Sequence, residues 1–427
     1  MFDVIIIGGG ASGFFAAINI AETNPDLKIV ILERGKEVLT KVKVSGGGRC
    51  NVTHAEFDPK ELIKNYPRGE KELLGPFYNY NCTDTIQFFE RRGIELKTEE
   101  DGRVFPVSNT SKTIIDCFLN ETARLGIKVF KHSTVTNIEP DLEDGISNGW
   151  KVTTIKNQYQ CKKILVATGS SPKIWKIMER LGHSIVSPVP SLFTFRINDE
   201  RISGIPGVST YAKVEVLPKK TFKPEITLKL KSGQSEKALL SAEGPVLVTH
   251  WGLSGPAILK VSAWGAFLLN ELNYNFPIRI NWLPDYHQGS ILSLLMEIKE
   301  VEAKKTVHRT KAVEIPRRLW INLAKAADIT STEKWAEVTK DQLQKLADQL
   351  TKGRFLVEGK STFKEEFVTA GGIDLKEIDF KTFESKIHPN LFFAGEVINV
   401  DAITGGFNFQ NAWTGAYMAA QGITNNT

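Results

Sequence analysis

Near the N-terminus, glycines stand at the spacing that lets a backbone turn hold a dinucleotide. Gly8, Gly10 and Gly13 form G-x-G-x-x-G after the apolar run of residues 2–7. The first glycine permits the tight turn, the second lets the main chain approach a pyrophosphate, and the third lets helix and strand pack closely. A helix starting near Ala11 would turn its N–H groups and its favourable dipole toward the phosphates.

An acidic residue stands where a ribose would need it. Glu33 comes twenty residues after Gly13 and follows a second apolar run, residues 27–32. A carboxylate there can accept hydrogen bonds from ribose hydroxyls, and it disfavours a 2′-phosphate. The order strand, glycine turn, helix, strand and acid predicts a βαβ dinucleotide-binding unit. It does not distinguish NAD from FAD.

The C-terminal region carries a pattern that favours FAD. LFFAGEV (residues 391–397) is a buried-strand run with Gly395 and Glu396 near its end, and a small-residue helix is expected after Gly405-Gly406. This resembles the second FAD fingerprint of glutathione-reductase-like flavoproteins. The resemblance implies that the acid binds the ribityl chain. It also implies that the helix N-terminus faces the flavin pyrimidine, where negative charge grows on reduction. Glu396 stands where Asp is commoner.

Two features of the middle of the chain agree with FAD. VATGSSP (residues 166–172) matches the Ala-Thr-Gly turn of the same superfamily. Residues 166–355 contain no second strand followed by G-x-G-x-x-G, which argues against a disulfide reductase with its own NAD(P)H domain. We therefore expect the middle of the chain to shape a substrate pocket.

The loop KVKVSGGGRCNVT (residues 41–53) carries the sharpest resemblance. Its core, SGGGRCN at 45–51, is close to the signature of the BaiN-like (also called YhiN-like) NAD(P)/FAD-dependent oxidoreductases. Further matches at 101–118, 249–259 and 367–379 extend the resemblance over nearly the whole chain. It implies an FAD domain built from both chain ends, with an inserted β-barrel that carries a small helical bundle. For one branch it also implies reduction of conjugated steroid enones in bile-acid metabolism.

The turns, the loop and the closing helix together supply the expected FAD contacts. Successive glycines let the main chain lie against a ligand, and the Arg49 guanidinium offers a donor fork for phosphate or a carboxylate. No metal site is expected. The residues expected to contact FAD are Gly8, Gly10, Ala11, Ser12, Gly13, Glu33, Arg34, Lys43, Ser45, Gly46, Gly47, Gly48, Arg49, Cys50, Asn51, Val135, Thr168, Gly169, Gly395, Glu396, Gly405, Gly406, Phe407 and Asn408.

Hydride transfer belongs to the flavin, so the protein needs to supply orientation, charge and one proton. His250, in the glycine-rich stretch THWGLSGP, is the best candidate for the proton; a hydrogen-bonded structural histidine is the alternative. Cys50 is either a redox-active thiol or a small packed residue in a tight loop. Arg103 and Lys43 are candidates for anion or flavin contacts, with a solvated or salt-bridged residue as the alternative for each. Thr369, with Gly371 and Gly372, predicts a glycine turn near the isoalloxazine.

Periodicity divides the chain into segments. Residues 134–161 alternate as an antiparallel meander, and residues 290–351 show apolar spacing typical of helices. We predict an α/β protein: a Rossmann-like, glutathione-reductase-type FAD-binding domain with an inserted β-barrel domain carrying a small helical bundle. The expected segments are 1–188 and 353–427 for the FAD-binding domain, 189–289 for the β-rich insert and 290–352 for the helices.

Composition limits the partners. The chain has 54 basic and 49 acidic residues, and a net charge of +5 over 427 residues is too small to argue for nucleic acid. Its four cysteines are scattered, which favours a reducing compartment over disulfides. No signal peptide or membrane span is expected, so cytoplasmic localisation follows by default, with no obligate protein partner.

Three functions compete at this point. The leading one is a flavin-dependent reductase or dehydrogenase, reduced by transient NAD(P)H and acting on a small apolar molecule, with a cyclic compound or an enone as options. The second is flavin-assisted tRNA modification, which predicts a basic groove. The third is a flavin-bound redox sensor or electron-transfer protein. The large insert favours an enzyme over a sensor.

Overall fold

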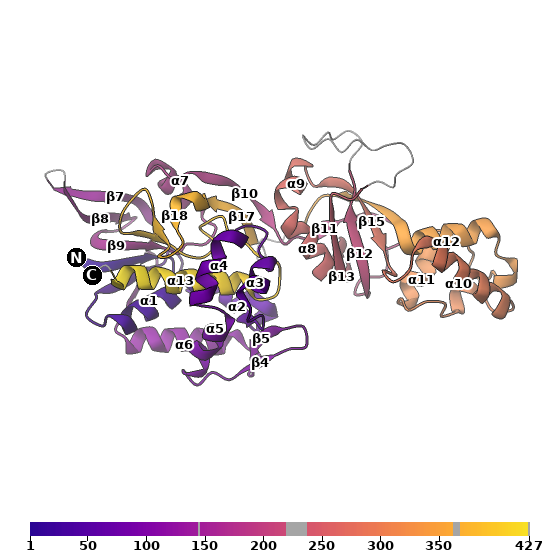
Figure 1. Cartoon of the computed structure of the whole chain (residues 1–427), viewed down its shortest axis with the longest axis horizontal. Coiled ribbons are helices and arrows are strands. Elements are labelled where there is room, and N and C mark those ends of the chain that lie inside the picture. The colour runs from indigo at the N-terminus through magenta and orange to yellow at the C-terminus, as the bar shows by residue number, and fades with distance from the viewer. Residues whose placement is uncertain (144–145, 219–236, 362–367, 426–427) are drawn as a thin grey trace. The chain divides into compact units, whose positions relative to one another are not determined.

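The computed structural model gives residues 1–143, 146–218, 237–361 and 368–425. The chain forms two compact units (Figure 1). Unit 1 comprises residues 1–190 and 365–427, and unit 2 comprises residues 191–364. Each is described by itself below.

Unit 1 is built on a parallel sheet of short apolar strands. β1 (Phe2–Ile7) lies between β2 (Ile29–Leu32) and β9 (Gln158–Val166). β6 (Lys128–Phe130) extends the sheet beyond β2, and β20 (Leu391–Phe393) extends it beyond β9. All four pairings are parallel. The predicted βαβ unit is confirmed, and a strand from the C-terminal region completes the same sheet.

The first and last helices of the chain pack together. α1 (Ala11–Thr23) and α13 (Phe407–Asn425) lie side by side (Figure 1). The ring of Phe15 on α1 lies 5.2 Å from that of Trp413 on α13. Both ends of the chain therefore share one core, as a two-ended FAD domain requires.

An antiparallel meander extends the parallel sheet, as the alternating pattern predicts. β7 (Val135–Glu143) pairs with β8 (Ile146–Thr154), which pairs with the first part of β9. The other elements of unit 1 are α2 (Thr40–Gly48), β3 (Thr53–His54), α3 (Pro59–Leu62), η1 (Ile63–Asn65), α4 (Glu70–Asn79), α5 (Cys82–Glu90), β4 (Leu96–Thr98), β5 (Arg103–Pro106), α6 (Ser111–Arg124), α7 (Pro172–Arg180), β10 (Ile185–Ser191), β17 (Val368–Ile373), η4 (Leu375–Glu377), β18 (Ile378–Asp379) and β19 (Glu384–Ser385).

Unit 2 contains a sheet that closes on itself. After its last strand, the amide of Ser361 donates to the carbonyl of Thr194 at 3.0 Å, and the amide of Arg196 donates to Gly359 at 2.9 Å. The last strand thereby returns to the first, which confirms the predicted barrel. In spatial order the strands are β11 (Phe195–Arg196), β14 (Gly252–Ser254), β13 (Leu240–Thr249), β12 (Ser209–Val216), β15 (Asn275–Asn281) and β16 (Gly353–Glu358).

Helices accompany the barrel. α12 begins with a capping box: the Thr339 hydroxyl accepts from the Gln342 amide at 3.2 Å, and the Gln342 side chain accepts from the Thr339 amide at 2.8 Å. Within the residues given above, no helix combines the length and apolar character needed to cross a membrane. The helices of unit 2 are α8 (Pro256–Trp264), α9 (Ala266–Glu271), α10 (Gln288–Val301), η2 (Val307–Arg309), α11 (Arg317–Lys325), η3 (Trp335–Glu337) and α12 (Lys340–Lys352).

Both boundaries of the insert differ from the expectation, the first by only two residues, since unit 1 extends to residue 190 rather than 188. The chain returns to unit 1 after residue 364 rather than at residue 353. Residues 353–358 form β16, in which Gly353, Phe355 and Val357 are buried while the residues between them are exposed. This alternation fits a strand with one face in the barrel interior, so β16 belongs to the insert rather than to the FAD-binding domain.

Candidate functional site

The N-terminal glycine turn excludes side chains at two positions. Gly8 has φ 113°, and a Cβ there would lie 2.4 Å from the Ala167 carbonyl oxygen. A Cβ on Gly13 would lie 2.0 Å from the Gly8 carbonyl oxygen. At Gly10, in contrast, a Cβ would meet nothing within 4 Å among the described residues. Gly8 and Gly13 are therefore needed for packing, whereas Gly10 leaves space in front of the N-terminus of α1, where Ala11 and Ser12 begin the helix.

Glu33 comes directly after β2, and its carboxylate connects the loop after β1 with the loop after β2. One oxygen accepts from the Gly9 amide at 2.8 Å, and the other accepts from the Gly35 amide at 2.7 Å. Five predicted residues line one pocket beside it: Gly8, Glu33, Arg34, Val135 and Thr168. The pocket is completed by Ile7, Leu32, Ser133, Thr134, Ser171, Lys173 and Ile174.

The loop of residues 45–51 follows a backbone path that favours glycine. Gly46, Gly47 and Gly48 have φ of 57°, 68° and 85°. The Cys50 amide closes the loop by donating to the Ser45 carbonyl at 3.0 Å. At Gly47 and Gly48 an added Cβ would meet nothing within 4 Å among the described residues, so main chain is open to a ligand there.

Asn51 ends this loop with an unusual side chain. Its Oδ1 is buried and has no hydrogen-bond partner in the described part of the chain. A buried acceptor without a donor costs free energy, so a ligand that presents an N–H to this atom would bind favourably. A flavin pyrimidine carries such a group.

Arg49 is held by the protein itself. Its guanidinium donates to Glu99 at 2.6 Å and lies 3.9 Å from the ring centroid of Phe105. Arg103 shares Glu99 at 3.1 Å and pairs with Asp101 at 2.7 Å. These contacts fix both guanidinium groups beside β5, and their roles in binding a cofactor or an anion remain predictions.

The C-terminal pattern meets the N-terminal one in space. A Cβ on Gly395, which has φ 75°, would lie 2.4 Å from the Ser12 hydroxyl on α1. A Cβ on Gly169 would lie 3.5 Å from a carboxylate oxygen of Glu396. The Thr-Gly turn after β9, the Gly-Glu turn after β20 and the start of α1 are thus neighbours.

Glu396 has a partner that the sequence analysis did not single out. Its Oε1 accepts from the Thr369 amide at 2.9 Å, and its Oε2 pairs with Lys41. The predicted contact Lys43 instead lies 3.5 Å from Glu37 and is 63% exposed. Residues two apart on a helix face different sides, so the spacing within KVK would have separated the two lysines.

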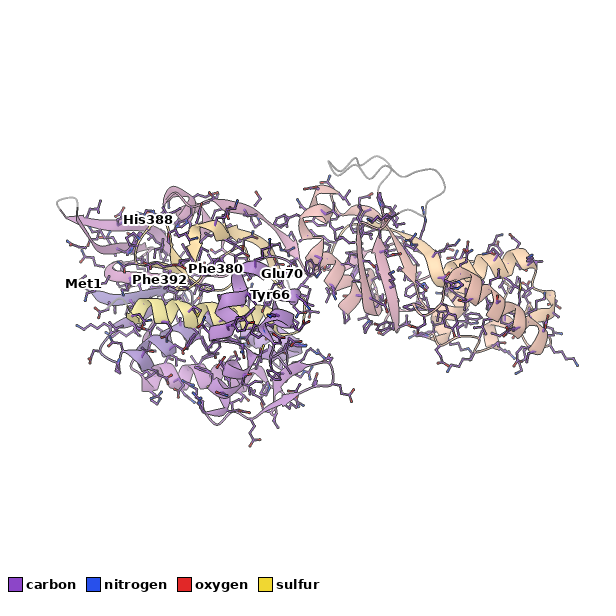
Figure 2. The ribbon with its side chains drawn as sticks, viewed as in Figure 1. Met1, Tyr66, Glu70, Phe380, His388 and Phe392 are labelled. Carbon is purple, nitrogen blue, oxygen red and sulfur yellow. The ribbon has the colours of Figure 1, made fainter. Side chains whose placement is uncertain are left out.

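Two residues that the sequence analysis did not name, His54 and Tyr66, hold the start of α13 in place. His54 Nδ1 lies 2.9 Å from the Gly405 carbonyl oxygen, and its ring lies 4.5 Å from that of Phe407. Because a carbonyl oxygen only accepts, Nδ1 carries the proton. The Tyr66 hydroxyl donates to the Phe407 carbonyl at 2.7 Å. Tyr66 is labelled in Figure 2. The one available signal was that His54 directly follows the loop of residues 41–53.

Gly406 and Asn408 are also engaged by neighbouring chain. A Cβ on Gly406 would lie 2.4 Å from the Thr53 carbonyl oxygen. The Asn408 side chain accepts from the amide of Ala402 and donates to its carbonyl, both at 3.0 Å. These contacts fix the loop before α13, so the positive end of this helix has a defined position.

The cysteines are buried, which favours the packing interpretation of Cys50. Burial raises the pKa of the Cys50 thiol to about 12 and that of Cys161 to about 12. Burial also raises the pKa of Cys82 and of Cys117 to about 11. Nucleophilic and redox chemistry needs the thiolate, which these environments suppress.

Two further predicted features have defined positions. His250 is exposed in the turn between β13 and β14 of unit 2, and its role as a proton donor remains a prediction. The glycine turn predicted at Thr369, Gly371 and Gly372 is wrong, because these residues lie in β17. Glycine is required there because of close packing: a Cβ on Gly371 would lie 2.7 Å from Pro188.

Together these features fit a dinucleotide that carries a flavin. One end of the site has the open N-terminus of α1 and the Glu33 pocket, suited to a pyrophosphate and a ribose. The other end has the glycine loop, the orphan Asn51 acceptor and the N-terminus of α13. A family model described as the HI0933-like protein Rossmann domain matches residues 2–422. The chain belongs to this family.

Known proteins resemble the chain over its whole length. Ribosomal RNA dihydrouridine synthase of Haemophilus influenzae is 29% identical over 98% of this chain and 98% of its own. 3-dehydro-bile acid delta(4,6)-reductase of Clostridium scindens is 24% identical over 97% of each chain. Among solved structures, 3-ketosteroid delta1-dehydrogenase from Sterolibacterium denitrificans aligns over 100% of both chains at 9% identity with a TM-score of 0.50, a likeness of fold. This HI0933-like protein is an FAD-dependent oxidoreductase with a Rossmann-type FAD-binding domain.

Proposed function

We propose that this flavoprotein reduces a carbon–carbon double bond conjugated to a carbonyl group, with NAD(P)H as the transient electron donor. Two full-length relatives with different substrates support this. Dihydrouridine is uridine in which the double bond conjugated to a ring carbonyl has been saturated, which is the product named for the relative at 29% identity. The relative at 24% identity is named for reducing a 3-dehydro bile acid, in which the delta(4,6) double bonds are likewise conjugated to a carbonyl.

The chain's own part in this chemistry is binding and charge placement. When bound and reduced by NAD(P)H, the flavin would supply the hydride, and an acid or water would supply the proton that completes the addition. Gly10 and the N-terminus of α1 would receive the pyrophosphate, and Glu33 the adenosine ribose. Asn51 would accept a hydrogen bond from the pyrimidine edge of the flavin. The N-terminus of α13, held by His54 through the Gly405 carbonyl, would favour negative charge on that edge.

For the substrate we propose a uracil base in ribosomal RNA. The observation that carries this is the full-length likeness to a ribosomal RNA dihydrouridine synthase. The distribution of charge agrees with it. Residues 191–364 hold 26 Lys and Arg against 18 Asp and Glu, a net charge of +8, whereas unit 1 holds 28 against 31, a net charge of −3. The expectation that no nucleic acid is involved used the whole-chain charge of +5, in which the negative charge of unit 1 hides part of the excess in residues 191–364.

The test uses the purified holoprotein and RNA that lacks the modification. Its flavin spectrum is recorded anaerobically after addition of NADH or NADPH, and bleaching by either identifies the donor. The reduced protein is then incubated with unmodified ribosomal RNA, and digested nucleosides are analysed by mass spectrometry. We expect uridine to gain two hydrogen atoms. A flavin that turns over with NAD(P)H but leaves every uridine unchanged would exclude the RNA substrate.

A small conjugated enone is the second candidate, favoured by the likeness to the bile acid reductase. The same reduced protein is therefore also incubated with a 4,6-dien-3-one steroid, whose absorbance falls when the conjugation is lost. Turnover of the steroid alone would select this candidate. A flavin that is reduced but transfers hydride to neither substrate would instead favour the electron-transfer or sensor function.

A further inference from the structure

We propose that an exposed basic segment of unit 2, residues 302–318, is the surface that docks the RNA substrate; this rests on the function proposed above. The segment joins α10 to α11 and begins α11. It contains six basic residues and two acidic ones. The six basic residues, all exposed, are Lys304, Lys305, Arg309, Lys311, Arg317 and Arg318.

Hydrogen bonds fix the backbone of this segment. The Val307 amide donates to the Glu333 carbonyl at 3.1 Å, and the Trp335 amide donates to the Lys305 carbonyl at 3.0 Å. Two tryptophans also hold the segment: the Trp320 indole donates to the Val307 carbonyl at 3.0 Å, and the Trp335 indole donates to the Thr310 hydroxyl at 2.9 Å. The charges therefore stand on a rigid support, which lowers the entropy lost when a partner binds.

Four of the six cations form none of the ion pairs found among the described residues. Both acids of the segment are already used: Glu302 pairs with Lys305 at 2.7 Å, and Glu314 pairs with Lys311 at 2.8 Å. The four that remain are Lys304, Arg309, Arg317 and Arg318. The segment thus presents cations to solvent while its own carboxylates are engaged.

The stability of the fold does not explain these charges. Arg317 and Arg318 are the first two residues of α11, and the first turn of this helix contains no acidic residue. Cations at a helix N-terminus oppose the helix dipole, and two adjacent guanidinium groups repel each other. An anionic partner would relieve both effects, which makes binding a better explanation than folding.

The chemistry of the segment fits the phosphates of RNA better than a lipid surface. Guanidinium groups bind phosphate oxygens through two parallel hydrogen bonds. A segment that inserts into a membrane also needs exposed apolar side chains. Here Val307, Val313 and Ile315 are at most 9% exposed. Val301, which directly precedes the segment, is 82% exposed, but one valine does not make the apolar face that membrane insertion needs.

The test compares two full-length holoprotein variants with the same change in net charge. One carries Lys304→Gln, Arg309→Gln, Arg317→Gln and Arg318→Gln. The control carries Lys71→Gln, Arg91→Gln, Lys112→Gln and Arg124→Gln, four exposed cations of unit 1. Binding to a fluorescently labelled RNA stem–loop with uridines in its loop is measured by anisotropy over a range of salt concentrations.

We expect the unit 2 variant to bind RNA about tenfold or more weakly, with a salt slope smaller by about 3, because each lost phosphate contact removes about 0.7–0.9. The control should bind as the natural protein does. If the fourfold variant loses FAD or its fold, the double variant Arg317→Gln/Arg318→Gln replaces it, with an expected decrease in slope of about 1.5.

Other results would overturn the assignment. If the natural protein forms dihydrouridine and the unit 2 variant binds RNA unchanged, the surface is wrong although the proposed function stands. If the natural protein neither binds nor modifies RNA, both fail. Unchanged RNA binding together with lost binding to phosphatidylglycerol vesicles would assign the segment to a membrane instead.

Discussion

At the residue scale, the glycines of the G-x-G-x-x-G motif have different roles in the site. Gly13 is enclosed by backbone, since an added Cβ would lie 2.0 Å from the Gly8 carbonyl oxygen. Gly10 has open space before it in the protein, so its missing side chain matters to a ligand rather than to the fold. Gly13 is therefore needed for folding, whereas we expect Gly10 to be needed for cofactor binding.

We predict that Gly10→Ala lowers the FAD content of the purified protein while leaving the thermal midpoint of the flavin-free form nearly unchanged. Gly13→Ala should lower both, because the turn must open to admit the methyl group. FAD content is measured from the flavin absorbance, and stability by circular dichroism after the cofactor is removed. Equal loss of stability in both flavin-free variants would contradict this division.

At the element scale, a buried histidine that follows α7 contacts η4 and β19 of unit 1. His183 is 3% exposed. Its Nδ1 lies 2.9 Å from a carboxylate oxygen of Glu377, and its Nε2 lies 3.1 Å from the Ser385 hydroxyl. Burial holds the pKa of His183 below its ordinary value, and the Glu377 carboxylate opposes that shift only in part. The folded protein therefore favours the neutral ring.

Because the unfolded chain takes up this proton more readily, the protein should lose stability as the pH falls below about 6.5, the ordinary pKa of histidine. The slope for one proton is at most about 1.4 kcal/mol per pH unit. In urea unfolding from pH 7.5 to 5.5, His183→Asn should show a shallower fall than the natural protein. His250→Asn, at an exposed position, serves as the control. An unchanged slope in His183→Asn would show that other groups govern the response to acid.

At the scale of the whole molecule, the chain has two cores with different tasks. Unit 1 gathers both chain ends around the cofactor site, and unit 2 closes its own barrel around Phe195, Phe276 and their neighbours. The predicted FAD contacts all lie in unit 1, whereas the positive charge excess lies in unit 2. Cofactor binding should therefore stabilise one part of the molecule selectively.

Differential scanning calorimetry should resolve two transitions, of which only one responds to FAD. At a free FAD concentration 100 times its Kd, the stabilisation is about 2.7 kcal/mol, which shifts the midpoint of a unit of this size by roughly 5–10 °C. The other transition should stay in place. A single transition that moves as a whole would show that the two cores unfold cooperatively.

Local patterns were sufficient wherever the structure depends on contacts close in sequence. The glycine spacing at residues 8–13 and the apolar runs of β1 and β2 predicted the βαβ unit, and the alternation in β7 and β8 predicted the meander. Resemblance predicted the barrel. The end of the insert was misplaced because β16 is short and pairs with β15, more than seventy residues earlier in the sequence. The strand β17 was predicted as a turn because glycines are typical of turns. In the structure these glycines are needed because neighbouring backbone leaves no space for a side chain.

The sequence by itself determined the dinucleotide-binding unit, because its strand, turn, helix and acid lie within about thirty residues and each has a direct steric or hydrogen-bonding reason. FAD and the plan that joins both chain ends came from the resemblance of the C-terminal pattern and of the glycine loop to known flavoproteins. Tertiary structure alone decided which charged side chains meet. Lys41 rather than Lys43 pairs with Glu396, Arg49 pairs with Glu99, and His54 contacts the carbonyl of Gly405 just before α13. Such pairings join residues up to 355 positions apart, and they depend on how the helices and strands pack rather than on any local pattern.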